Sequence, residues 1–311
     1  MEIAVLGFVG SKNIGDYIQT KAVIDIVGSK NIKILDRENL HKYNKENIKT
    51  IINGWFMENP KNWPPSKKII PLFISFHINP STKGELLKKE SLEYFKKHEP
   101  IGCRDYYTRD LLIEKGIKAY FSSCITTTLN RKTYLNKNTK PTGIIVIGPF
   151  DRLKPTINKK TISKLLLSTL KYPLKKVRYD IKLSKFNRHL NNQKTKIKRH
   201  NQIVNSPIKC HNEGLELADE MLKKIALSEI LITSRIHAAL PALAMGLKVV
   251  FIDDGLEHEN HKQRLSGLKN FFNTTNLKDF FMVNLDNLLA GEAHNHHIKK
   301  TKLTIKNFLN Q

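Results

Sequence analysis

An arginine and a histidine, Arg235 and His237, lie two positions apart where an apolar strand leads into a helix of small residues. Backbone N–H groups at the start of a helix lack partners and the helix dipole is positive there, so an anion is favoured. Arg235 adds a permanent cation suited to phosphate or carboxylate, and His237 adds a proton carrier that works near neutral pH. With Ser234 before them, they predict an anion site with an acid/base group. The alternative is structural: Ser234 caps the helix, Arg235 forms a salt bridge and His237 packs under the sheet.

A second candidate follows the first predicted strand, in the loop GFVGSKNIGD at residues 7–16. Glycines in such a loop can bring backbone N–H groups close to a ligand. The spacing matches neither the dinucleotide-binding pattern nor the Walker A motif. The loop is therefore either a tight turn or a binding loop, in which Asn13, Gly15 and Asp16 are the candidate residues.

Two further candidates follow later strands. Arg104 and Asp105 end a short strand, and they either serve the site or form a surface pair in which Asp105 caps the next helix. The polar run at residues 121–129 places Ser123 at the end of the last N-terminal strand, where its hydroxyl either faces the cleft or satisfies the backbone. Cys124 has no adjacent base, so we interpret it as a buried thiol.

Alternating apolar runs and helical patterns predict the elements that position these groups. The expected strands are 2–8, 31–36, 50–56, 69–77, 101–104, 118–122, 143–148, 229–233 and 248–253. The expected helices are 14–27, 83–98, 107–115, 212–227 and 298–309. This alternation is typical of parallel sheets with helices on both faces, which bind ligands at the carboxyl ends of the strands.

A change of composition to Asn, Lys, Thr and Pro around residues 130–142 predicts a linker. We therefore expect an α/β protein with two Rossmann-like, doubly wound domains that face each other across a cleft. Residues 1–135 form the first domain, on the acceptor side, which contributes Arg104. Residues 142–295 form the second, which carries the Ser234–His237 site, and a helix in residues 296–311 packs back.

The charge of the 311-residue chain is unusual. Its 53 Lys and Arg residues against 28 Asp and Glu residues give a net charge of +25, which attracts nucleic acid, anionic membranes or phosphorylated substrates. Alternatively, a coding bias towards Lys and Asn places lysine on every solvated face. The most basic segment, 171–200, contains eleven Lys or Arg residues and one acid, Asp180. It is interpreted as a flexible loop or as a surface that meets anionic lipid.

Several classes of protein are disfavoured. We find no stretch of about 20 apolar residues that would span a membrane and no signal peptide. The three cysteines lack metal-binding spacing, which favours a reducing cytoplasm and argues against zinc. We find no helix-turn-helix, zinc finger or RNP pattern, so no specific nucleic-acid partner is expected.

Taken in order, these segments resemble the polysaccharide pyruvyl transferase family. The resemblance runs from about residue 3 to about residue 275. The matching segments are Asn13-Ile14-Gly15-Asp16, Ile52-Asn53-Gly54-Trp55-Phe56, Gly102-Cys103-Arg104-Asp105, Gly116 to Leu129, Ser234-Arg235-Ile236-His237-Ala238 and Ser266-Gly267. Each motif is loosely defined when taken alone, but the whole series in the right order is hard to obtain by chance.

The resemblance implies a glycosyltransferase-B-like fold and transfer of pyruvate from phosphoenolpyruvate to sugar hydroxyls as a ketal. It implies that His237 is the acid/base and that Arg235 binds the donor. It also implies donor binding by Arg104, whose motif matches the family less closely. Phosphoenolpyruvate is then the donor substrate, and neither a metal nor another cofactor is needed. The expected acceptor is a surface or capsular glycan or its lipid-linked precursor, modified in the cytoplasm or peripherally on the inner, anionic membrane face.

Two other functions compete with this one. A nucleotide-sugar-dependent glycosyltransferase of the same architecture would bind a nucleoside diphosphate, but the sequence around His237 lacks the glutamate pair that would support it. A non-catalytic basic protein would bind nucleic acid in a salt-sensitive way that does not depend on His237.

Overall fold

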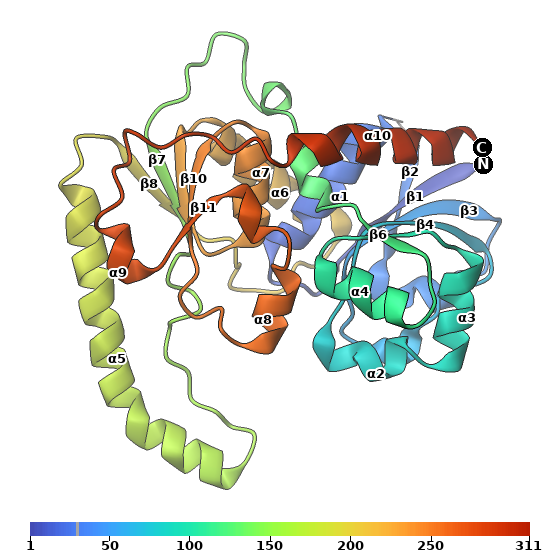
Figure 1. The fold of residues 1–311 in the computed structure, drawn as a ribbon, viewed down its shortest axis with the longest axis horizontal. Helices are drawn as coiled ribbons and strands as arrows, with labels where there is room; N and C mark the ends of the chain where they lie inside the picture. The colour runs from blue at the N-terminus through green and yellow to red at the C-terminus, as the bar shows by residue number, and fades with distance from the viewer. Residues whose placement is uncertain (29–30) are drawn as a thin grey trace.

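The computed structural model describes residues 1–28 and 31–311 of the chain. It contains two parallel β-sheets flanked by helices (Figure 1), one of six strands and one of five. The expected α/β class with Rossmann-like parallel sheets is therefore confirmed.

The first sheet has the strand order β2-β1-β3-β4-β5-β6. Its strands are β1 (Glu2–Gly7), β2 (Ile32–Asp36), β3 (Ile48–Phe56), β4 (Ile69–Ile78), β5 (Ile101–Cys103) and β6 (Ala119–Phe121). The helices that connect them are α1 (Ile14–Val27), α2 (Lys83–Leu86), α3 (Lys89–Lys97) and α4 (Tyr106–Glu114). The strand order changes direction between β1 and β3, and the crevice outside such a switch point is where open parallel sheets bind ligands.

The second sheet has the order β11-β10-β9-β7-β8, with its switch point between β7 and β9. Its strands are β7 (Ile144–Ile147), β8 (Ile197–His200), β9 (Ile230–Thr233), β10 (Lys248–Ile252) and β11 (Asn273–Thr275). The helices of this half are α5 (Ile162–Asn191), α6 (His211–Ala226), α7 (Ile236–Ala244), α8 (Glu259–Arg264), α9 (Leu277–Phe280) and α10 (Asn295–Asn310). The loops after β7 and β9 therefore lie at this second switch point.

One apolar core runs from the first sheet to the second through α1, α6 and α7. Helix α1 lies against α6, where the Tyr17 hydroxyl is 2.9 Å from His211 Nδ1. A Cβ atom at Gly214 would lie 2.4 Å from the Tyr17 ring, so only glycine lets the two helices approach this closely. A second, smaller cluster covers the opposite face of the second sheet, beneath α5 and α9.

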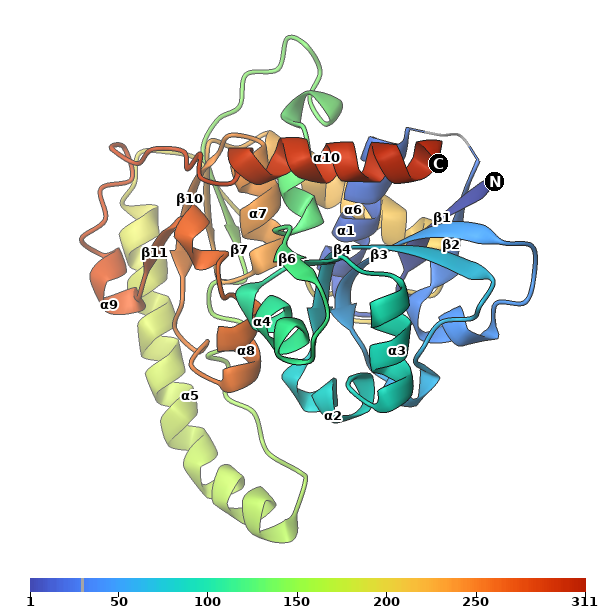
Figure 2. The same ribbon diagram turned by 45° about the vertical axis from the view of Figure 1, so that its right-hand side comes forward.

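The last helix, α10, crosses back to the first half of the chain, and the two termini lie near each other in both views (Figures 1 and 2). The Lys49 ammonium group donates to the carbonyls of Phe308 and Leu309, at 2.9 and 3.3 Å. The Thr301 hydroxyl donates to the Ser122 carbonyl at 3.2 Å. These contacts fix α10 beside strands β3 and β6.

The structure corrects two expectations. The helix expected at residues 83–98 is broken into α2 and α3. The flexible loop considered for the basic segment 171–200 is wrong, because most of that segment is the second part of α5, a 30-residue helix that continues through Pro173. Lysine, arginine and leucine favour helix, and the Thr161 side chain caps its first turn by accepting from Lys164 N. Within the described ranges, no helix is long and apolar enough to cross a membrane.

Candidate functional site

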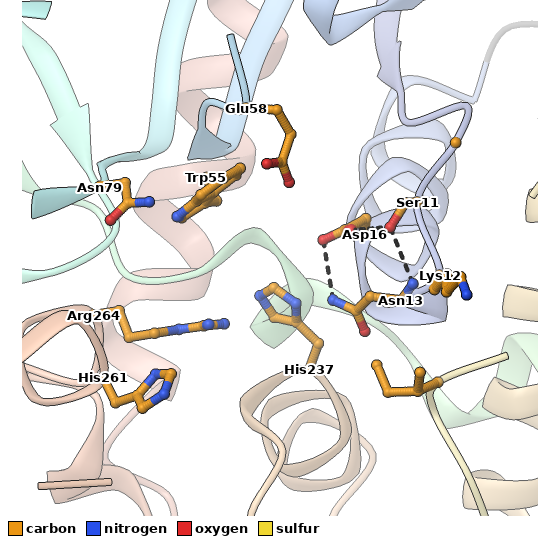
Figure 3. A pocket seen from close by; sticks show the side chains of 12 residues that line it. Ser11, Lys12, Asn13, Asp16, Trp55, Glu58, Asn79, His237, His261 and Arg264 are labelled. Carbon is orange, nitrogen blue, oxygen red and sulfur yellow. Dashed lines mark hydrogen bonds between the residues drawn. The ribbon is translucent and has the colours of Figure 1, made fainter. Parts of the chain in front are cut away.

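A cavity of about 440 Å³ lies where the carboxyl ends of the two sheets meet (Figure 3). The first half of the chain contributes the loop after β1, the end of β3 and residues that follow β3 and β4. The second half contributes residues of α7 and α8. The lining residues are Gly10, Ser11, Lys12, Asn13, Asp16, Trp55, Glu58, Asn79, Ile203, His237, His261 and Arg264. The site therefore combines groups from both switch points.

The loop after β1 presents its polar side chains as a linked set. Asn13 caps α1 by accepting from Gly15 N at 3.1 Å, and its amide donates to Asp16 Oδ1 at 3.2 Å. The Ser11 hydroxyl donates to Asp16 Oδ2 at 2.7 Å (Figure 3). Burial raises the pKa of Asp16, although Arg37 and the Ser11 hydroxyl act in the opposite direction. These bonds hold a carboxylate at the mouth of the cavity.

Gly15 brings this loop into direct contact with the histidine of the second sheet. A Cβ atom at position 15 would lie 2.7 Å from His237 Cβ and 2.1 Å from Gln202 Nε2. Any side chain at this position would push the first turn of α1 away from α7. The glycine is therefore required by the close approach of the two halves at the site.

His237 lies in the first turn of α7 and faces the cavity (Figure 3). Burial lowers its pKa well below the usual value, and the positive charges of Arg104 and Arg264 lower it further. Its Nε2 has no hydrogen-bond partner among residues 1–28 and 31–311. In the free protein His237 is thus a neutral imidazole, and a bound anion would raise its pKa towards neutrality.

Arg264, at the end of α8, lines the cavity together with a second basic residue, Lys12. Burial lowers the pKa of Arg264 to about 9, and repulsion from Arg104, Arg152 and Arg235 adds to the effect. Arg152, after β7, has a pKa lowered to about 10 by burial and by Arg235, and its Nη1 lies 2.9 Å from His261 Nε2. Several guanidinium groups are therefore held close together, and the opposing effects of Asp151 on Arg152 and of Asp16 on Arg264 are smaller than the effect of burial.

Arg104 lies behind the cavity and is fully buried. Its Nε is 3.6 Å from Asp105 Oδ2, and its guanidinium has no hydrogen bond within the described part of the chain. The alternative in which Arg104 and Asp105 form a surface pair is wrong, because both side chains are 0% exposed. The expected cap is confirmed, since Asp105 accepts from Thr108 N at 2.9 Å.

Asp105 also contacts His77 on β4, because its Oδ2 lies 2.6 Å from His77 Nδ1. Burial lowers the pKa of His77 to about 4, against the opposing effect of Asp105. Burial alone would raise the pKa of Asp105, but His77 and Arg104 bring it below its usual value. The first half of the chain thus places a second neutral imidazole near the arginines.

Arg235 forms an ion pair, as in the structural interpretation of its motif. Its Nε and Nη2 donate to Asp151 Oδ2 at 2.8 and 2.5 Å, and its side chain remains partly exposed. Ser234 does not cap α7, because the N-cap residue is Arg235 and the Ser234 hydroxyl donates to the Gly148 carbonyl at 2.8 Å. Both residues tie the loop after β9 to the loop after β7.

Trp55 and Glu58 form the cavity wall opposite His237 (Figure 3). The Arg37 guanidinium lies over one face of the Trp55 ring, with its Cζ atom 5.0 Å from the ring centroid. A smaller cavity of about 250 Å³ continues from this wall towards Asp36 and Arg37. The wall offers an aromatic face and carboxylate acceptors, which suit a neutral ligand rich in hydroxyl groups.

The structure thus brings together several of the residues that the sequence singled out. His237, Asn13 and Asp16 line the cavity, and Gly15 supports it. Ser123 is fully buried with a φ of 63°, and its hydroxyl has no partner among the residues described. Cys124 is a buried thiol, as expected.

Sequence reasoning missed other functional groups. No role was predicted for Arg264, which is a desolvated cation of the cavity wall. Arg152, His77 and His261 received no role. Trp55 lies at the C-terminal end of β3 and Glu58 follows it, so the same strand-end rule that singled out the other segments would have found them.

In the part of the chain that the structure describes, no group of three or more His, Cys, Asp or Glu residues is placed to hold a metal ion.

Comparison with known proteins assigns the chain to a family. Among solved structures, a protein of Klebsiella pneumoniae subsp. pneumoniae NTUH-K2044, described as a functional uncharacterized protein, is similar at 12% identity over 85% of this chain and 87% of that chain, with a TM-score of 0.49. None of the curated proteins matches. The model of the polysaccharide pyruvyl transferase family matches residues 13–255, which begin at the Asn13 loop and extend past the His237 motif to the end of β10. The chain therefore belongs to the polysaccharide pyruvyl transferase family.

Proposed function

We propose that this protein transfers pyruvate from phosphoenolpyruvate to two hydroxyl groups of a sugar, forming a ketal on a surface or capsular polysaccharide or its lipid-linked precursor. The observation that carries the proposal is the group of three desolvated arginines at the cavity, Arg104, Arg152 and Arg264, each with side-chain nitrogens that have no hydrogen-bond partner among the described residues. Phosphoenolpyruvate has both a phosphate and a carboxylate, so it supplies the negative charge that this set lacks.

The donor would lie between Arg264 and His237 in the cavity. Arg264 is the guanidinium that already faces this space, and Arg104 acts on it from behind. Arg235 would join them by exchanging its bond with Asp151 for one with the donor. Cations in these positions favour the departure of phosphate, because they stabilise the charge that develops on the leaving oxygen.

The reaction requires proton transfers that suit His237. One sugar hydroxyl loses its proton as its oxygen bonds to C2 of the donor, C3 gains a proton, and the bond between C2 and the phosphate oxygen breaks to release inorganic phosphate, which takes up the second proton. The second hydroxyl loses its proton as its oxygen bonds to C2. Neutral His237 can accept a hydroxyl proton, and its pKa rises once the donor anion is bound, so that it can also act as the acid. The proposed mechanism uses neither a metal nor another cofactor.

The acceptor sugar would lie against the opposite wall, formed by Trp55, Glu58 and Asp16. These groups come from the first half of the chain, in line with the expected acceptor side. The position of the cavity between the two sheets supports a glycosyltransferase-B-like arrangement, in which donor and acceptor meet across a cleft.

The direct test is calorimetry with phosphoenolpyruvate, UDP and GDP on the purified protein at two salt concentrations. We expect saturable binding of phosphoenolpyruvate that is lost in Arg235→Ala and Arg264→Ala and kept in Arg188→Ala, which removes an exposed arginine far along α5. Binding of UDP or GDP without binding of phosphoenolpyruvate would overturn the proposal in favour of a nucleotide-sugar-dependent glycosyltransferase.

A second test separates the roles of two residues. With a sugar acceptor and a phosphate-release assay, His237→Ala should lower kcat, whereas Arg235→Ala should mainly raise the donor KM. Small and equal effects of both substitutions would show that the reaction takes place elsewhere.

A further inference from the structure

Helix α5 extends well beyond the body of the protein (Figures 1 and 2). Only its C-terminal part is buried, where Phe186 and Leu190 pack into the second core cluster with Phe150 and Phe280. The first part of the helix, which is the end farthest from the sheets in both views, carries no buried residue. A helix of this length therefore presents most of its surface to the surroundings.

Five apolar side chains form a continuous stripe along this exposed part. Leu166, Leu170, Leu174, Val177 and Ile181 follow one another at intervals of three or four positions, which places them on one helix face. Their exposed fractions lie between 51% and 76%. Tyr179, Leu183, Phe186 and Leu190, which pack on the second sheet, lie on the opposite face by the same spacing. The apolar stripe of α5 thus points away from the protein core.

A basic stripe runs beside the apolar stripe. Lys171, Lys175, Arg178, Lys182 and Lys185 also follow at intervals of three or four positions, and all are exposed. The single acidic residue of α5, Asp180, is paired with Lys176 at 2.5 Å. An apolar face bordered by a lysine- and arginine-rich face is the pattern of helices that lie in the plane of a membrane surface.

We propose that α5 docks this protein on an anionic lipid membrane, with its apolar stripe in the boundary between headgroups and acyl chains. The charge decides the kind of partner. A second copy of the chain would bring another basic helix and another +25 charges to the contact, whereas an anionic leaflet attracts each lysine and arginine. The proposal does not depend on the transferase activity, but it would place the cavity near lipid-linked acceptors on the inner membrane face.

The test is co-sedimentation of the full-length protein with vesicles of phosphatidylcholine alone and of phosphatidylcholine mixed with phosphatidylglycerol. We expect binding to the anionic vesicles only. The triple variant Lys171→Gln, Lys175→Gln, Arg178→Gln should bind about 100-fold more weakly at low salt, because each charge near the surface contributes several-fold to affinity. The double variant Leu170→Gln, Leu174→Gln should bind at least about 10-fold more weakly, because the apolar contribution is also required.

Two matched variants control for charge and for exposed apolar area. Lys132→Gln, Lys137→Gln, Lys140→Gln removes three exposed lysines outside α5, and Leu289→Gln, Leu303→Gln removes two exposed leucines elsewhere. Both should bind like the unmodified protein. Circular dichroism shows that each variant is folded.

Three results would overturn the proposal. One is equal or absent binding to the two kinds of vesicle. Another is a loss in the charge control as large as in the α5 charge variant, which would indicate attraction by overall charge alone. The third is a dimer in analytical ultracentrifugation that Leu170→Gln, Leu174→Gln dissociates, because the stripe would then be an interface between copies of the chain.

Discussion

Replacing Arg264 by methionine should make the free protein more stable while it removes donor binding. The pKa of Arg264 falls from 12.5 to about 9, mainly through burial, so its charged form is disfavoured in the folded protein. The difference corresponds to about 5 kcal/mol if none of it is screened. Water in the cavity screens part of this energy and the methionine loses some contacts, so we expect the free energy of unfolding to rise by about 1–3 kcal/mol.

Urea unfolding with and without phosphoenolpyruvate measures both effects. In the unmodified protein, donor at about 100 times its dissociation constant should add about 2.7 kcal/mol to the free energy of unfolding. In Arg264→Met the baseline should be higher and the addition by the donor should vanish. Arg188→Met, which removes an exposed arginine, should change neither value.

Either of two results would refute this reasoning. If Arg264→Met is less stable than the unmodified protein, the guanidinium is already compensated in the free protein, and its surroundings do not call for an anion. If the donor stabilises the variant as much as the unmodified protein, phosphoenolpyruvate does not bind beside Arg264.

Three more predictions concern the groups around the cavity. Gly15→Ala should lower stability by about 1–3 kcal/mol and reduce activity, because its Cβ would lie 2.7 Å from His237 Cβ. The control Gly84→Ala, whose Cβ meets no atom within 4 Å, should lower neither in urea unfolding and phosphate-release assays, because alanine favours helix α2 more than glycine does. His237→Gln should lower kcat by about 100-fold or more with little change in donor KM, and a kcat within a few-fold of the original would exclude an acid/base role. The pKa of His77 in the folded protein is about 4, below its usual value of 6.5, so the unmodified protein should lose stability as the pH falls from about 6.5 to about 4. In His77→Asn, the free energy of unfolding should fall less over this range, and the two losses should differ by on the order of 3 kcal/mol in urea unfolding at pH 7 and pH 4. Equal losses in the two proteins would show that His77 does not cause this pH dependence.

The sequence located much of the fold because local patterns determine it. The predicted helix 14–27 has the observed bounds of α1, since Asn13 supplies a cap and Gly28 adopts the left-handed conformation that ends the helix. The strands alternate with helices as expected, and the rule that ligands lie at strand ends indicated the Asn13 loop and the His237 motif.

The rest depended on contacts between distant parts of the chain. Arg235 pairs with Asp151, 84 positions away, and no local pattern predicts that bond. Arg264 was not singled out from the sequence, because only the packing of α8 against the cavity desolvates it. Helix α5 was missed because Pro173 and the many lysines resemble a loop in composition, whereas the three- and four-residue spacing of its leucines indicates a helix.

The continuous core that joins the two sheets limits how the two halves of the protein can move during the reaction. Opening the cleft as a hinge would pull α1 away from α6 and expose apolar side chains such as those around Tyr17 to water. We therefore expect the two halves to keep the same relative position throughout the proposed reaction. Small displacements of loops would then set the rate of product release. For the same reason, the protein should unfold in a single cooperative transition.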